Sequence, residues 1–95
     1  MTAKRVDANQ KSIVKMLRDF GASVQDLHNI GHGCPDILVG YGGRSYPMEV
    51  KSPGGVLTKD EYDWQQNWRG NYYIIHNIEE ALQILCNGVE DDQMP

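Results

Sequence analysis

Two neighbouring segments decide the fold: Gly33-Cys34-Pro35-Asp36-Ile37-Leu38-Val39-Gly40 and Tyr46-Pro47-Met48-Glu49-Val50-Lys51. Their aliphatic and aromatic residues are typical of β-strands. The connection Tyr41-Gly42-Gly43-Arg44-Ser45 contains a glycine pair, which supplies the permissive backbone that a tight turn needs. The pattern predicts a β-hairpin with strands over 36–40 and 46–51. Pro47 cannot donate to a strand ladder, so we expect it at a sheet edge or at a bulge.

Three charged side chains are expected to meet at one end of this hairpin. Alternate side chains of a strand share a face, so Glu49 and Lys51 point the same way. If the hairpin pairs Asp36 near Glu49, two carboxylates and an amine converge beside the glycine-rich loop 31–35. Carboxylates and the carbonyl of Val50 are oxygen ligands that suit a hard cation, and such a cluster favours metal-assisted phosphodiester hydrolysis. For an isolated Glu-x-Lys, an exposed and merely solvated pair is the commoner situation.

Helices and further strands are predicted on both sides of the hairpin. Apolar residues at helical spacing from Ile13 to Phe20 predict a helix over 9–20 that ends at Gly21. The other predicted elements are a strand over 22–28, a helix from Thr58 to Gly70 with a Thr58–Glu61 capping box, a strand over 72–76, and a helix that Asn77 caps and Asn87-Gly88 end. This order of elements indicates an α/β fold.

Basic residues offer several candidate contacts to phosphate. Lys11, Lys15 and Arg18 follow one another on one face of the first predicted helix. They form either an ordinary solvated face, which is the commoner case, or a stripe that contacts a nucleic-acid backbone. The other candidates are His32, Arg44 and Lys59, and His28 flanks the same loop as His32.

Trp64 and Trp68 lie four residues apart on one face of the predicted helix 58–70. Paired aromatic residues at this spacing usually bury against a neighbour. We therefore expect core packing or a dimer contact for this pair, in preference to stacking on a nucleobase.

The composition is that of one small folded domain. The chain has 95 residues, of which 40% are hydrophobic and 23% are charged. No apolar run approaches the roughly 20 residues of a membrane span, and the start of the chain lacks a signal-peptide core. Cys34 and Cys86 do not have the spacing of a zinc site. We expect a cytosolic protein with reduced thiols.

The net charge of −4 comes from 9 basic and 13 acidic residues. Residues 90–95 are expected to form an acidic, disordered tail, which leaves a nearly neutral body over 1–89. Such a body binds a polyanion only if its positive charges cluster or a metal ion neutralises the carboxylates. Charge alone therefore leaves the partner open.

The hairpin motifs support a family resemblance. Pro35-Asp36 in the first segment, followed by Glu49-Val50-Lys51 in the second, resembles the signature of the PD-(D/E)XK nuclease superfamily. Within it, residues 7–86 are most similar to the small stand-alone VRR-NUC domains of phages and bacteria. The resemblance implies a restriction-endonuclease-like minimal αβββαβα core, in which helices flank a mixed central sheet, and a single nuclease domain over 1–89.

The resemblance also implies roles for individual residues. Asp36 and Glu49 would be side-chain ligands of Mg²⁺ or Mn²⁺, with the Val50 carbonyl as a third ligand and Lys51 as the catalytic lysine. Gln10 stands where many members have a glutamate, so it would hold a metal-bound water without adding charge. Glu61 occupies the place of a family glutamine, although its capping box explains the residue equally well.

The function that this resemblance implies is that of a metal-dependent DNA endonuclease. Its relatives imply a homodimer that selects branched DNA such as Holliday junctions, in the cytoplasm of a bacterium or a phage-infected cell, with no membrane and no small-molecule cofactor involved. The alternative is a non-catalytic DNA-binding or accessory module of a larger phage nuclease or recombination complex. Retention of Asp36, Glu49 and Lys51 together argues against that alternative, because clustered carboxylates without a metal repel one another.

Overall fold

The computed structural model describes residues 8–93, and the side chains of residues 8–88. The elements in chain order are α1 (Ala8–Phe20), β1 (Ser23–Asp26), β2 (Ile37–Tyr41), β3 (Arg44–Val50), α2 (Lys59–Asn67), β4 (Tyr73–Ile75) and α3 (Ile78–Gln93). Three helices and four strands therefore follow one another in the predicted order, and the chain has an α/β fold. None of the helices in the described part is long and apolar enough to cross a membrane.

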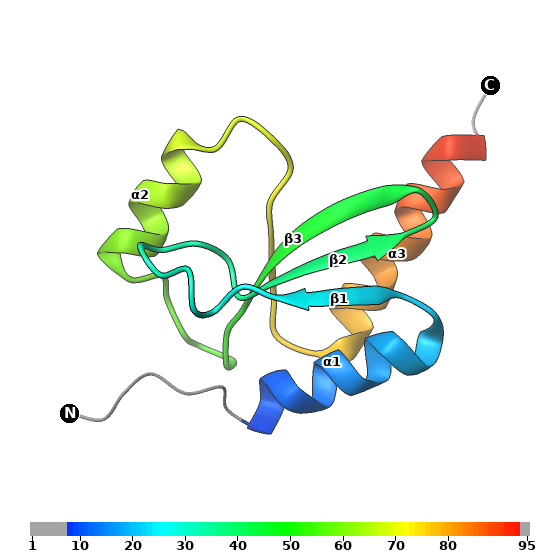
Figure 1. Cartoon of the computed structure of the whole chain (residues 1–95), viewed down its shortest axis with the longest axis horizontal. Coiled ribbons are helices and arrows are strands. Elements are labelled where there is room, and N and C mark those ends of the chain that lie inside the picture. Colours follow the sequence, from blue (N-terminus) through cyan, green and yellow to red (C-terminus); the bar gives the residue numbers. More distant parts are fainter. Residues whose placement is uncertain (1–7, 94–95) are drawn as a thin grey trace.

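The four strands form one mixed sheet in the order β1-β2-β3-β4. Figure 1 shows β1, β2 and β3 side by side. The first three strands are antiparallel to their neighbours, and β4 runs parallel to β3. Pro47 lies opposite Leu38, one residue before the β3–β4 pairing begins at Met48. At that position β3 has a neighbouring strand on one side only, which satisfies the edge condition for proline.

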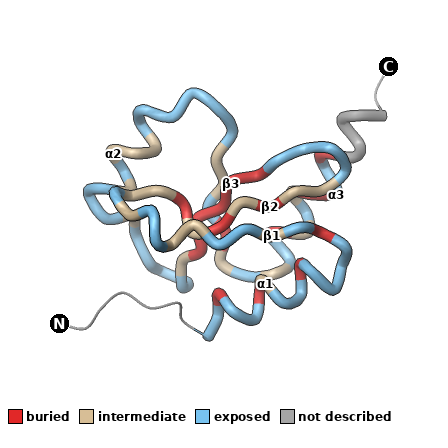
Figure 2. Tube along the Cα trace, in the orientation of Figure 1, coloured by how far each residue is buried: buried red, intermediate tan, exposed pale blue. Residues whose placement is uncertain are grey.

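One face of the sheet carries the hydrophobic core, and α1 and α3 pack over it. Alternation along the hairpin sends Ile37, Val39, Met48 and Val50 to this face. The buried hydrophobic residues are Ile13, Leu17, Ala22, Ile37, Val39, Tyr46, Met48, Val50, Ile75, Ala81 and Leu85. Figure 2 shows them gathered on the strands and on the inner sides of these two helices. The same alternation leaves Glu49 on the opposite face.

The helix α2 stands apart from this core (Figures 1 and 2). Its predicted capping box is confirmed, because the Thr58 hydroxyl accepts from the Glu61 N–H at 3.2 Å and Glu61 Oε1 accepts from the Thr58 N–H at 2.9 Å. None of its residues is buried, and Trp68, which follows the helix, is exposed, so Trp64 and Trp68 are not part of the core. The other expectation for the pair, a dimer contact, stays a prediction. The helix ends at Asn67, three residues before the predicted stop at Gly70.

The last helix runs beyond its predicted end at Asn87-Gly88 and continues to Gln93. A Cβ atom at Gly88 would collide with the hydroxyl of Tyr46. Glycine is therefore present at this position for close packing of α3 on β3, and not as a helix stop. Residues 90–93 of the expected disordered tail continue α3, and residues 94–95 lie outside the described part of the chain. Leu85 is the core residue of this segment, while Cys86 is exposed.

Candidate active site

Asp36 is placed by the loop and by the hairpin register. Its predecessor Pro35 is fully buried, and Ile37 pairs with Met48, so Asp36 comes next to Glu49 as the hairpin predicted. The Asp36 carbonyl accepts from the Leu27 N–H at 2.9 Å, and its Oδ2 accepts from the Val50 N–H at 2.9 Å. These two hydrogen bonds fix both the backbone and the carboxylate of Asp36.

Glu49 is a buried carboxyl group, with 2% of the residue exposed. Its Oε1 atom has no hydrogen-bond partner among the described residues. Burial, together with the negative charge of Asp36, raises the pKa of Glu49 from 4.5 to about 9. In the absence of a cation, the site therefore disfavours the ionised form of Glu49.

Lys51 reaches the same cluster from the end of β3. Its Nζ lies 3.9 Å from Glu49 Oε2 and 2.7 Å from Glu61 Oε1. Although burial opposes it, the hydrogen bond to Glu61 raises the pKa of Lys51 above its usual value. Burial likewise opposes the effect of Lys51 on Glu61, whose pKa is lowered by that bond. Glu61 is thus both a member of the capping box and the anion that favours the charged form of Lys51.

Tyr72 is a member of this site that the sequence pattern did not single out. Its hydroxyl is buried without a hydrogen-bond partner in the described part of the chain. Burial raises the pKa of Tyr72, and Glu49, Glu61 and Asp36 raise it further. Glu49 pairs with Ile74, and Tyr72 lies two residues before Ile74. Side-chain alternation therefore directs Tyr72 to the same side as Glu49. That pairing becomes visible only once β4 is known to join β3.

Cys34 lies near the same carboxylates, in the loop before β2. Burial raises the pKa of the Cys34 thiol, and the charges of Glu49 and Asp36 add to this effect. The thiol is therefore held in its neutral form and is not an activated nucleophile.

The donor set suits a hard divalent cation. Two carboxylates and the main-chain carbonyl of Val50 offer oxygen ligands, and Glu49 Oε1 is a buried oxygen that lacks a partner within the described residues. In the described segments, no group of three or more His, Cys, Asp and Glu side chains is arranged to hold a metal. A cation here would therefore depend on the Val50 carbonyl and on the substrate for its remaining ligands.

The three basic residues of α1 line one groove, but two of them are bonded within the chain. On α1, Lys15 pairs with Asp19 at 2.8 Å, and Arg18 donates to the Val24 carbonyl at 3.0 Å. Lys11 lines the same groove between α1 and β1, which also contains Asp26. Part of this stripe is therefore neutralised within the chain, as on an ordinary solvated face.

The other predicted site residues lie in separate places. Gln10 is buried on α1 and lines the α1–β1 groove. Arg44 begins β3, at the opposite end of the strand from Glu49. Lys59 pairs with Asp63 at 2.6 Å, and His28 pairs with Asp26 at 2.7 Å. His32 is exposed on the loop before β2 and has a positive φ of 58°.

Comparison with known proteins gives no relative for this chain. No protein-family model, no curated protein and no solved structure matches it. The function is therefore inferred from the chemistry of the site.

Proposed function

We propose that the protein is a metal-dependent endodeoxyribonuclease of the PD-(D/E)XK type, similar to VRR-NUC domains. The observation that carries the proposal is the environment of Glu49, a buried carboxyl group with an unpartnered oxygen beside Asp36 and Lys51. Ionising a buried carboxyl group beside a second carboxylate costs free energy even with Lys51 nearby, and a bound cation would remove that cost. A site of this kind is best explained by a hard metal ion and an anionic substrate.

Each residue of the cluster has a proposed role. Asp36, Glu49 and the Val50 carbonyl hold Mg²⁺ or Mn²⁺, which when bound polarises a phosphodiester and acidifies water. Lys51 donates hydrogen bonds to the phosphoryl oxygens as negative charge grows on them. Because Glu61 keeps Lys51 protonated, the lysine acts as a cationic donor and not as a general base. Glu61 is a positioning residue, since it acts through Lys51.

Assembly and substrate belong to the same proposal. A protein of this size with a net charge of −4 has little surface that attracts DNA, and a homodimer would combine two α1 stripes with two active sites. The contacts to the DNA phosphates are made by Lys11, Lys15 and Arg18, and Gln10 lines the same groove. Branched DNA is the proposed target, and the proposed setting is the cytoplasm of a bacterium or of a phage-infected cell.

The proposal is tested by cleavage of labelled four-way junction, flap, single-stranded and duplex DNA in Mg²⁺, in Mn²⁺ and in chelator. We expect cleavage that requires a metal and is lost in Lys51→Ala. Arg69→Ala is the control, because it removes one positive charge from an exposed position outside the site. Intact dimers that bind DNA and cut none of these substrates would favour the non-catalytic or accessory module instead.

A further inference from the structure

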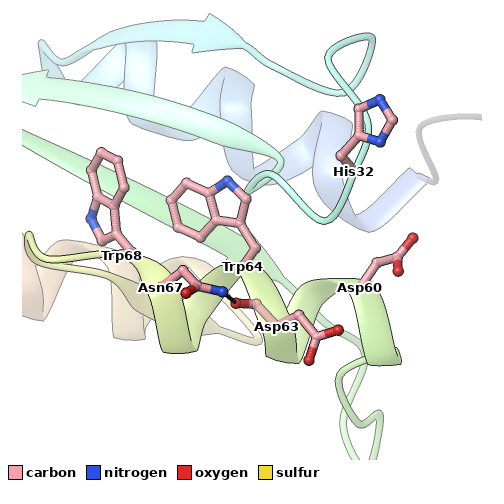
Figure 3. Close-up of a pocket in the computed structure, with 6 residues that line it drawn as sticks. All are labelled: His32, Asp60, Asp63, Trp64, Asn67 and Trp68. Carbon is pink, nitrogen blue, oxygen red and sulfur yellow. Dashed lines mark hydrogen bonds between the residues drawn. The ribbon is translucent and has the colours of Figure 1, made fainter.

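A pocket with aromatic walls lies between α2 and the loop that precedes β2. It has a volume of about 360 Å³ and is lined by His32, Asp60, Asp63, Trp64, Asn67 and Trp68. In Figure 3 both indole rings project from the same side of α2, and His32 comes from the loop across from Asp60. The pocket lies outside the hydrophobic core, so packing of the fold does not explain these rings.

The aromatic rings form a fixed stack. Trp64 and Trp68 are stacked with their ring centroids 4.7 Å apart and an interplanar angle of 21°. The ring centroids of Tyr72 and Trp64 are 5.7 Å apart. Trp68 Nε1 donates to the Asn71 carbonyl at 2.7 Å, which fixes the outer ring. Trp68 remains 45% exposed. A preordered and accessible ring binds a flat aromatic group with little further loss of side-chain entropy.

The polar groups of the pocket select what can stack there. Asp63 is paired with Lys59 at 2.6 Å. The Asp60 carboxylate repels a phosphate group, but it can accept from the N–H groups at the edge of a nucleobase. Asn67 is oriented by its own hydrogen bond to the Asp63 carbonyl at 2.8 Å. A second copy of this chain fits less well, because a two-fold contact would bring like carboxylates together. The pocket therefore suits a flat, uncharged group with edge donors.

The pocket is joined to the candidate active site through α2 and the loop before β2. Gly33 packs so closely on α2 that an added Cβ would collide with the backbone of Asp60 and Glu61. That contact joins the loop carrying His32 and Asp36 to the helix whose Glu61 holds Lys51. A base in this pocket is therefore a near neighbour of a phosphodiester at the carboxylate cluster.

We propose that this pocket binds an unstacked nucleobase of the DNA substrate. The inference rests on the proposed nuclease function, and it deepens that function by naming the substrate class as DNA with an unpaired base beside the cleaved bond. A base within a paired duplex must first be unstacked at an energetic cost. The cost is small for a base at a branch, bulge or flap. Selectivity for irregular DNA follows from this difference.

The test measures binding separately from cleavage. Three duplexes are compared that carry, at one position, an unpaired 2-aminopurine, a paired 2-aminopurine or an unpaired abasic residue. Affinity and 2-aminopurine emission are measured in Mg²⁺ with the Lys51→Ala protein, after a gel has shown that the DNA stays intact. We expect the unpaired base to bind roughly tenfold more tightly than either other DNA, with quenched emission, as for stacking of one base on an aromatic side chain.

Protein variants test the same point from the other side. Trp68→Leu should remove the preference for the unpaired base and leave binding of the paired duplex unchanged. Tyr62→Leu is the matched control, because Tyr62 is an exposed aromatic residue of α2 outside the pocket, and it should keep the preference. The abasic DNA gives the same comparison with an unaltered pocket, so the test does not depend on the folding of Trp68→Leu.

Two results would overturn the pocket assignment. One is equal affinity for the three DNAs. The other is a Trp68→Leu protein that dissociates from dimer to monomer while keeping the base preference, which would make this surface a subunit contact. Failure of the two proposals is distinguishable: base preference without any cleavage by the unaltered protein overturns the nuclease alone, and metal-dependent cleavage without base preference overturns the pocket alone.

Discussion

Lys51 and Glu61 are joined by an ion pair of 2.7 Å that ties the end of β3 to the first turn of α2. The same Glu61 oxygen accepts from the Thr58 N–H at 2.9 Å. One carboxylate thus completes the capping box of α2 and orients the proposed catalytic lysine. The helix therefore has a function although it contributes no buried residue to the core.

Substitutions at Glu61 should separate these two roles. Glu61→Gln keeps an acceptor for the Thr58 N–H but loses the ion pair with Lys51, so cleavage should fall strongly and stability should fall less than in Glu61→Ala. Glu61→Ala loses both roles and should also reduce the free energy of unfolding by about 1 kcal/mol. Cleavage rates and urea denaturation of both variants make the comparison. Equal loss of stability in the two would show that the charge, and not the cap, supports the helix.

The buried Glu49 predicts an unusual dependence of stability on pH in the absence of metal. Folding raises the pKa of Glu49 from 4.5 to about 9, so between these values the folded chain binds more protons than the unfolded chain. The contribution of Glu49 to stability is therefore complete below about pH 4.5 and is lost as the pH rises toward about 9. Glu49→Gln should flatten this decline. Denaturation in chelator across the range measures it, and an identical decline in the variant would assign it to other groups.

Gly88 should resist a substitution that normally stabilises a helix. Alanine in place of glycine in a helix interior usually gains about 1 kcal/mol. Here Gly88→Ala should lose about 1–3 kcal/mol, because its Cβ would meet the Tyr46 hydroxyl. Combining Gly88→Ala with Tyr46→Phe should recover part of that loss. Thermal unfolding of the single and double variants gives the coupling energy between positions 88 and 46. A stabilising Gly88→Ala would show that α3 does not pack closely on Tyr46 of β3.

The basic stripe on α1 should control the salt dependence of DNA binding. Replacing Lys11, Lys15 and Arg18 with alanine should weaken binding to all DNA shapes and flatten the plot of affinity against salt. Asp19→Asn should have the opposite effect, because it releases Lys15 from its ion pair. Titrations at several salt concentrations measure both changes. An unchanged slope in the triple variant would leave the stripe as a solvated face.

Local sequence signals predicted much of this fold. The hairpin followed from strand alternation and from a glycine-containing turn, and the capping box followed from the Thr58–Glu61 spacing. The approach of Asp36 to Glu49 also follows from hairpin register alone. Because these features depend on residues close in the chain, one sequence is sufficient to predict them.

Features that depend on distant contacts were missed. Gly88 has the sequence appearance of a helix stop, and only the position of Tyr46 on β3 shows that it allows close packing. Tyr72 joins the carboxylates only because β4 pairs with β3 in parallel. Trp64 and Trp68 were expected in the core or at a dimer contact, yet both lie outside the core and line a pocket that His32 of a distant loop completes. In each case, the partner is supplied by tertiary structure.

The most direct test of the central claim is cleavage of a labelled four-way junction by the unaltered protein and by Asp36→Asn, in Mg²⁺ and in chelator. The carboxylate cluster predicts cleavage by the unaltered protein in Mg²⁺ only, and none by a folded Asp36→Asn protein. Cleavage that persists in chelator, or at an undiminished rate in Asp36→Asn, would contradict a metal-dependent nuclease site at Asp36 and Glu49.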